Sequence, residues 1–125
     1  MATTHSYVWS KPPQGVIKLN VDAATTSTAS WLAVVARNGE GKLLLWWAKG
    51  IPLCDPLFAE AKAEAVLWAL QLALSEQFLY VIIEGDSQIC MDSLNGNSSY
   101  GSWSISSICN DILALCKSFS GCNFC

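Results

Sequence analysis

The sequence predicts an α/β fold in which helices cover a mixed five-stranded sheet. Three strand-like segments follow one another, and Asn38-Gly39 lies between the second and the third. Two long helical segments then flank residues 80–84, a short apolar run of the kind that parallel sheets bury on both faces. The order strand-strand-strand-helix-strand-helix-helix-strand therefore predicts three antiparallel strands followed by parallel ones.

The first strand is expected at residues 16–22, where apolar and polar side chains alternate. Asp22 closes the polar side of this strand, and a loop is expected over the small polar residues 23–30. A buried carboxylate at a strand end is costly unless positive charge lies beside it. Asp22 is therefore either a turn former or one ligand of a divalent cation.

The next two strands are expected at residues 31–36 and 42–49. The Asn38-Gly39 turn between them suits a hairpin that needs positive φ angles. Asp55-Pro56 predicts the start of a helix, with aspartate as the N-cap and proline at the first helical position. The alanine- and leucine-rich segment that follows predicts a helix to about residue 76.

The second half of the chain alternates strands and helices. We expect a central strand at residues 80–84, a short helix at 87–94, a long helix at 102–117 and a last strand from 121. This last strand is expected to be incomplete at Cys125.

The composition is that of one dense globular domain. The chain has 125 residues, of which 52% are hydrophobic and 14% charged. We expect an extended N-terminal segment at residues 1–15 and the domain at residues 16–125. The net charge of -3 gives no global basic field. A nucleic-acid ligand would therefore need a local positive patch or bound cations.

The six cysteines are expected to be reduced thiols. The first ten residues contain no secretory signal, and the single C-x-x-C and the single histidine do not make a zinc site. We therefore expect a cytoplasmic or nuclear protein that is not secreted. No apolar run approaches the ~18 residues of a membrane span, so no membrane association is expected.

Three acids occupy positions at which their side chains could meet. Asp22 ends the first strand, Glu60 lies in the first turns of the long helix, and Asp86 follows the central strand. Each also has an ordinary interpretation: Glu60 as a solvated helix residue and Asp86 as an N-cap. Together they match two-metal phosphodiester hydrolysis, in which Mg²⁺ ions bound by carboxylates activate a water and stabilise the leaving oxygen.

Five stretches carry a family resemblance: residues 9–13, 17–24, 35–41, 55–61 and 81–87. With them the chain resembles the ribonuclease H type 1 superfamily, in particular the reverse-transcriptase-like ribonuclease H domains abundant in plants. The resemblance implies a ribonuclease H-like fold and endonucleolytic cleavage of RNA in RNA–DNA hybrids. It also implies dependence on Mg²⁺, with Mn²⁺ as a possible substitute, and the metal ligands Asp22, Glu60 and Asp86. We expect the domain to be a monomer.

Two alternatives stay open within this resemblance. Glu64 lies one helical turn after Glu60 and could replace it as the helix ligand. The family also carries a further aspartate after its last strand, and many members have a histidine ahead of it. Neither matches a position of this sequence. The alternative function is therefore a catalytically inactive ribonuclease H-like module that binds nucleic acid or protein.

Overall fold

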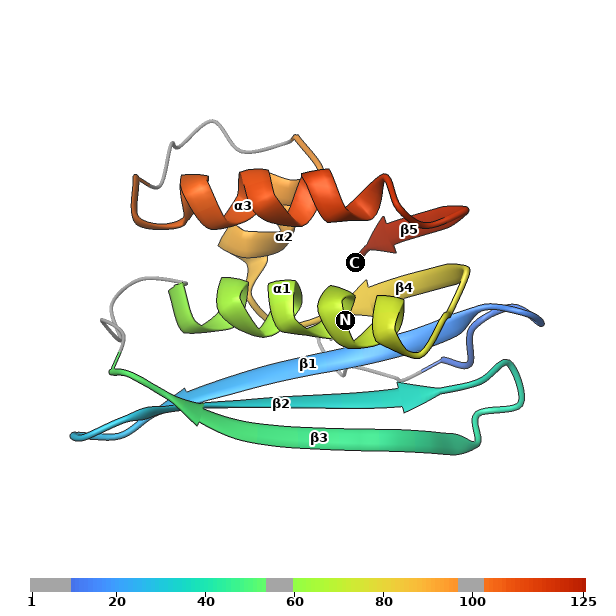
Figure 1. Ribbon diagram of the computed structural model, residues 1–125, viewed down its shortest axis with the longest axis horizontal. Coiled ribbons are helices and arrows are strands. Elements are labelled where there is room, and N and C mark those ends of the chain that lie inside the picture. Colours follow the sequence, from blue (N-terminus) through green and yellow to red (C-terminus); the bar gives the residue numbers. More distant parts are fainter. Residues whose placement is uncertain (1–9, 54–59, 97–102) are drawn as a thin grey trace, which may run out of the picture.

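A computed structural model describes residues 10–53, 60–96 and 103–125 (Figure 1). Its elements are β1 (Ile17–Thr25), β2 (Ser30–Arg37), β3 (Leu43–Ile51), α1 (Glu60–Ser75), β4 (Tyr80–Glu84), α2 (Gln88–Leu94), α3 (Trp103–Cys116) and β5 (Gly121–Phe124). This order agrees with the predicted one.

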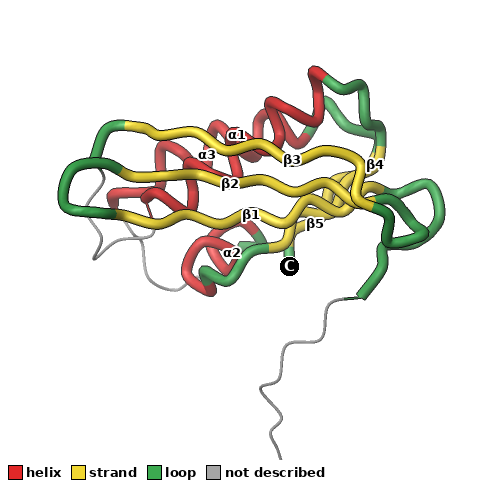
Figure 2. Tube along the Cα trace, turned by 90° about the horizontal axis from the view of Figure 1, so that it is seen from below, coloured by secondary structure: helices red, strands yellow, loops and turns green. Residues whose placement is uncertain are grey.

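The five strands form one mixed sheet in the order β3-β2-β1-β4-β5. β1 pairs antiparallel with β2, and β2 with β3, whereas β4 runs parallel to both β1 and β5. The three helices lie on one side of this sheet, and the view in Figure 2 looks onto the other side. The predicted fold class is confirmed.

The core lies between the sheet and the helices. β1 contributes Leu19 and Val21, and α1 packs against the sheet through a buried face rich in alanine, which includes Ala63 and Ala69. α3 packs on α1 and buries Ile112. Alanines let a helix approach the strands closely, so the first turns of α1 come near the ends of β1 and β4.

β1 is longer than predicted. Residues 23–25, expected in a loop, continue the ladder with β2, and Thr25 pairs with Ser30. The turn between the strands is stabilised by Thr26, whose amide N–H and hydroxyl both bond the carbonyl of Ala29 at 2.8 and 3.0 Å. Pairing with β2 therefore overrides the weak strand preference of small residues. It also places Asp22 inside a strand and not in a turn.

The hairpin between β2 and β3 forms where predicted, but its positive φ angle is at Gly41 (+78°). The side chain of Asn38 accepts the amide N–H of Glu40 at 2.9 Å and of Lys42 at 3.0 Å. Asn38 thus acts through its side chain, as asparagine often does at turns.

The helix boundaries agree with the prediction where they are described. Asp55-Pro56, the predicted start of the long helix, lies outside the described residues, as does the part of the N-terminal segment before residue 10. α2 is capped by Ser87, whose hydroxyl accepts the Cys90 amide N–H at 3.3 Å. The ordinary interpretation of Asp86 as that N-cap is therefore wrong, and its carboxylate is available for another contact.

The structure also bears on two predictions from the sequence, the reduced cysteines and the absence of a membrane span. The described cysteines, residues 90, 109, 116, 122 and 125, are free thiols. Burial raises the pKa of Cys90 to about 12, so this thiol is an inert core residue. None of the helices in the described part of the chain is long and apolar enough to cross a membrane.

Candidate functional site

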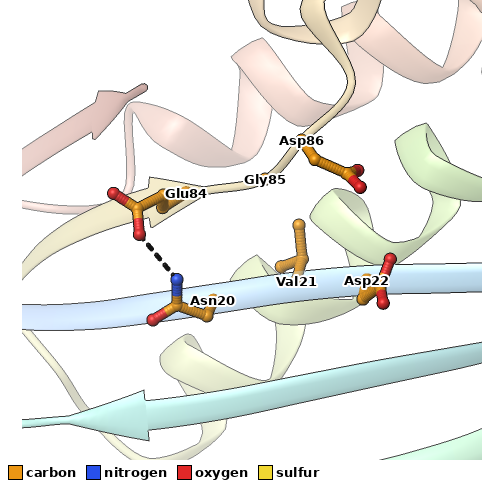
Figure 3. A pocket seen from close by; sticks show the side chains of 6 residues that line it. All are labelled: Asn20, Val21, Asp22, Glu84, Gly85 and Asp86. Carbon is orange, nitrogen blue, oxygen red and sulfur yellow. Dashed lines mark hydrogen bonds between the residues drawn. The ribbon is translucent and has the colours of Figure 1, made fainter. Parts of the chain in front are cut away.

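Asp22, inside β1, and Asp86, just after the end of β4, lie side by side on two neighbouring parallel strands. The last residues paired between β1 and β4 are Asn20 and Glu84. Asp22 lies two residues beyond the first of these and Asp86 two residues beyond the second. The two aspartates therefore stand level at the carboxyl end of the sheet, where α/β sheets bind ligands (Figure 3). We call them the acid pair.

One ammonium group joins the two carboxylates of the acid pair. Lys62, from the first turn of α1, places its Nζ 2.7 Å from Oδ1 of Asp22 and 2.9 Å from Oδ1 of Asp86. Oδ1 of Asp22 also accepts the amide N–H of Ala23 at 2.8 Å. The carboxylate side chains are 70% and 74% exposed, whereas that of Lys62 is 29% exposed. The partly buried ammonium thus contacts both carboxylates, and most of the surface of each carboxylate side chain stays exposed to solvent.

The pKa values of these groups follow from the contacts. Partial burial alone would raise the pKa of Asp22, but the hydrogen bonds from Lys62 and from Ala23 bring it below its ordinary value of 3.8. Burial alone would lower the pKa of Lys62, but its hydrogen bonds to Asp22 and Asp86 raise it above 10.5. At neutral pH the bridge therefore contains the ammonium of Lys62 and the ionised carboxylate of Asp22.

Glu60 and Glu64, the alternative helix ligands of the sequence analysis, both lie on α1. Glu60 is its first residue and Glu64 stands one turn later. Within the described ranges no three acidic, histidine or cysteine side chains come close enough to hold one metal ion. The structure thus brings Asp22 and Asp86 together, while a role for either glutamate stays a prediction.

A second group of polar side chains lies beside the acid pair. Lys18, Asn20 and Glu84, which we call the Lys18 cluster, join β1 to β4. Glu84 contacts Nζ of Lys18 at 2.9 Å and accepts a hydrogen bond from the Asn20 amide at 2.7 Å. Burial raises the pKa of Glu84, and the hydrogen bond that its carboxylate accepts from the Cys125 thiol offsets only part of this rise.

An open cleft connects the two groups. It has a volume of about 280 Å³ and is lined by residues 20–22 of β1 and 84–86 after β4 (Figure 3). Figure 3 also shows the hydrogen bond between Asn20 and Glu84 at one end and the two aspartates at the other. A ligand in this cleft would lie against both groups of polar side chains.

The observed donor set does not fit the Mg²⁺ ions that the family resemblance implies. Mg²⁺ requires several oxygen ligands at about 2.0–2.1 Å in octahedral geometry. Here the two convergent carboxylates already share the Lys62 ammonium, and it donates to one oxygen of each. This arrangement matches one monovalent cation between two anions.

Lys62 is the site residue that the sequence analysis missed. It is the lone basic residue of α1, but its position between two buried alanines, Ala61 and Ala63, is seen only in the structure. α1 is apolar over most of its length, so periodicity does not show which face meets the strand ends.

Three solved structures with similar folds show how widely the architecture is shared. Ribonuclease H1 from the halophilic archaeon Halobacterium salinarum superposes with a TM-score of 0.81 and 18% identity, over 88% of this chain and 83% of that one. LC11-RNase H1 in complex with an RNA/DNA hybrid gives 0.75 and 16%, over 87% and 83%. The N-terminal ribonuclease H domain of a Mycobacterium tuberculosis protein, solved as a maltose-binding-protein fusion, gives 0.75 and 12%, over 87% and 84%.

At these identities the likeness establishes the fold. No curated protein matches the sequence. A family model does match, over residues 20–125, and its description is "Reverse transcriptase-like". The matched range includes both members of the acid pair and Lys62. The chain therefore belongs to the reverse transcriptase-like family and has the ribonuclease H fold.

Proposed function

We propose that this chain binds RNA–DNA hybrids as a ribonuclease H-like domain, with the acid pair at the centre of the binding site. The observation that carries the proposal is the convergence of Asp22, on β1, and Asp86, just after β4, on one cation. Support comes from two similar folds, LC11-RNase H1 and foamy virus protease-reverse transcriptase, both solved with an RNA/DNA hybrid. The latter has a TM-score of 0.67, and this chain covers 19% of it.

The groups that line the cleft could contact the RNA strand of a hybrid. Two bare carboxylates would repel a phosphate backbone, but the Lys62 ammonium between them reduces that repulsion. The open carboxylate oxygens can accept hydrogen bonds, and a ribose 2′-OH is a donor that DNA lacks. The acid pair would therefore contact the RNA strand, and the cleft beside it would take the adjoining sugar-phosphate.

Hydrolysis of the RNA strand is the second candidate function. It would use Asp22 and Asp86 with Glu60, or Glu64 in its place, as ligands of Mg²⁺ or Mn²⁺. The convergence of Asp22 and Asp86 favours this candidate. The position of Lys62 opposes it, because the ammonium would have to leave both carboxylates before a divalent ion could approach them. Binding without turnover is therefore the better-supported function.

The remaining features belong to the same proposal. The domain at residues 16–125 acts as a monomer in the cytoplasm or the nucleus, where its cysteines stay reduced. No membrane and no zinc is involved.

The test is a binding and cleavage assay on one labelled RNA–DNA hybrid, in EDTA, in Mg²⁺ and in Mn²⁺. We expect a shifted complex in all three buffers and intact RNA in each. Duplex DNA of the same sequence should compete less well, because it lacks the 2′-OH. Asp22→Asn should weaken hybrid binding several-fold, and Asp111→Asn, a matched loss of charge at an exposed position of α3, should not.

The outcomes separate the two functions. RNA cleavage in Mg²⁺ or Mn²⁺ that disappears in Asp22→Asn would select hydrolysis over simple binding. Failure to retain the hybrid in any buffer, by a protein that melts cooperatively, would contradict both functions.

A further inference from the structure

We infer that the Lys62 ammonium is a built-in cation of the acid pair, which takes the place of a divalent metal and makes hybrid binding by this domain independent of metal ions. The inference rests on the proposed function for its second half. Its first half concerns Asp22, Asp86 and Lys62 alone, and it can be tested without nucleic acid.

Geometry is the first argument. A cation that serves two carboxylates from different strands must lie between them, and Nζ of Lys62 lies there, within 3 Å of an oxygen of each. Oδ1 of Asp22 already accepts a second hydrogen bond, from the Ala23 amide. A metal ion at this oxygen would displace the ammonium and compete with the backbone donor.

The attachment of Lys62 is the second argument. Its side chain lines a small pocket with Val21, Val66 and Met91, and it is less than one-third exposed. The aliphatic stem is therefore packed while the ammonium reaches the acids, as long cationic side chains often arrange themselves. Unlike a metal ion, this cation cannot dissociate or be removed by a chelator.

Charge is the third argument. The two carboxylates of the acid pair both form an ion pair with Lys62, whose single positive charge balances one of their two formal negative charges. A divalent ion would approach a site with a single net negative charge and would meet a fixed positive charge inside it. At separations of a few ångströms this repulsion should weaken divalent binding by about ten-fold or more. An ammonium also lacks the Lewis acidity that activates a bound water.

Titration of Mn²⁺ into the full chain, followed by calorimetry or by the resonance signal of free Mn²⁺, tests the inference directly. We expect Lys62→Gln to bind Mn²⁺ at least ten-fold more tightly than the unmodified chain. Lys49→Gln removes the same charge from a lysine that lies over the Trp68 ring, 4.6 Å from its centroid, and should behave like the unmodified chain. Adding Asp22→Asn to Lys62→Gln should abolish the gain.

Each outcome decides the matter. Equal Mn²⁺ affinity of the unmodified chain and Lys62→Gln, at any value, would overturn the inference, and so would an equal gain in Lys49→Gln. Lys62→Met, which keeps the packed stem, provides a second variant if the glutamine variant melts at lower temperature.

Hybrid binding in EDTA supplies a separate readout. We expect the unmodified chain to bind hybrid equally well in EDTA and in Mg²⁺, whereas Lys62→Gln should bind better in Mg²⁺. A domain that binds no hybrid at all would refute the proposed function, yet the Mn²⁺ titration would still decide the role of Lys62. A Mg²⁺ requirement in the unmodified chain would overturn the inference.

Discussion

The acid pair with Lys62 and the Lys18 cluster are two neighbouring lysine–carboxylate groups, and they differ in burial. Both use residues of β1, but the lysine of the first group comes from α1. In the Lys18 cluster the side chains of Lys18 and Glu84 are 5% and 14% exposed. Around Lys62 the carboxylates are 70% and 74% exposed. The contact distances are nearly the same in both groups, between 2.7 and 2.9 Å.

This difference separates a structural ion pair from a site. A buried charge that loses its partner pays a large desolvation cost, so each member of the Lys18 cluster fixes the others in place. Lys18 also donates to the carbonyl of Ser10 at 2.8 Å, which fastens the segment before β1. The exposed carboxylates contribute little to folding and remain free to meet a ligand.

The largest effect is expected when the buried cluster loses its carboxylate. Glu84→Gln leaves the Lys18 ammonium, at 5% exposure, without this counter-charge and should lower the free energy of unfolding by about 2–3 kcal/mol. The matched change at the exposed site, Asp86→Asn, should cost less than about 0.5 kcal/mol. Urea unfolding of both variants measures the contrast, and equal losses would show that burial does not distinguish the two groups.

A smaller effect is expected at Gly85, which stands between Glu84 and Asp86. A methyl group there would lie 3.0 Å from the side-chain ends of Val21 and Met91, closer than ordinary contact. Gly85→Ala should therefore cost about 1 kcal/mol and move Asp86 relative to Lys62.

Met91→Leu removes the methyl end that Gly85→Ala would meet, and it supplies the control. The double variant should lose less stability than the two single variants together, as measured by thermal melts. If the stability losses of the two single variants simply add in the double variant, the methyl group that Gly85→Ala introduces does not clash with Met91.

The smallest effect is the pH dependence of the exposed bridge. The pKa of Asp22 is lower in the folded chain, so its contribution is present above pH 3.8 and is lost as the pH falls through the folded value. The raised pKa of Lys62 gives a contribution present below pH 10.5 and lost as the pH rises through the folded value. Solvent exposure reduces both to a few tenths of a kcal/mol.

Asp22→Asn should therefore change stability slightly between pH 5 and pH 9. The difference should vanish at a pH well below the folded pKa of Asp22, where the aspartate is protonated and, like asparagine, carries no charge. Unfolding curves over this pH range provide the measurement. A constant difference down to the lowest pH would assign the effect to packing and not to charge.

The sequence predicted most of the architecture because hydrophobic patterns report burial directly. Alternation over residues 17–22, the apolar run at 80–84 and the helix-forming segments each identified an element that the structure contains. The convergence of Asp22 and Asp86 was also expected, because each was predicted at the end of a strand, although Asp22 lies inside β1. The extension of β1 to Thr25 did not, because it depends on pairing with β2 rather than on residue preference.

The role of Lys62 could not be predicted for a related reason. Residues at the start of α1 reach the strand ends only in one rotation of the helix about its axis. That rotation is set by how the alanines pack on the sheet, and apolar residues are found on most sides of α1. The sequence therefore favoured the two acids on either side of this lysine, Glu60 and Glu64, as the helix residues of the site.

The pairing of β1 with β4 has one more consequence. The alignment that sets Asn20 opposite Glu84 also sets Asp22 level with Asp86, so backbone register and carboxylate geometry are a single property of the fold. A slip of one residue would put Val21 level with Asp86 and turn the Asp22 side chain to the opposite face. Any substitution that weakens the pairing of β1 with β4 would thus separate the two carboxylates, even where it changes no residue of the site.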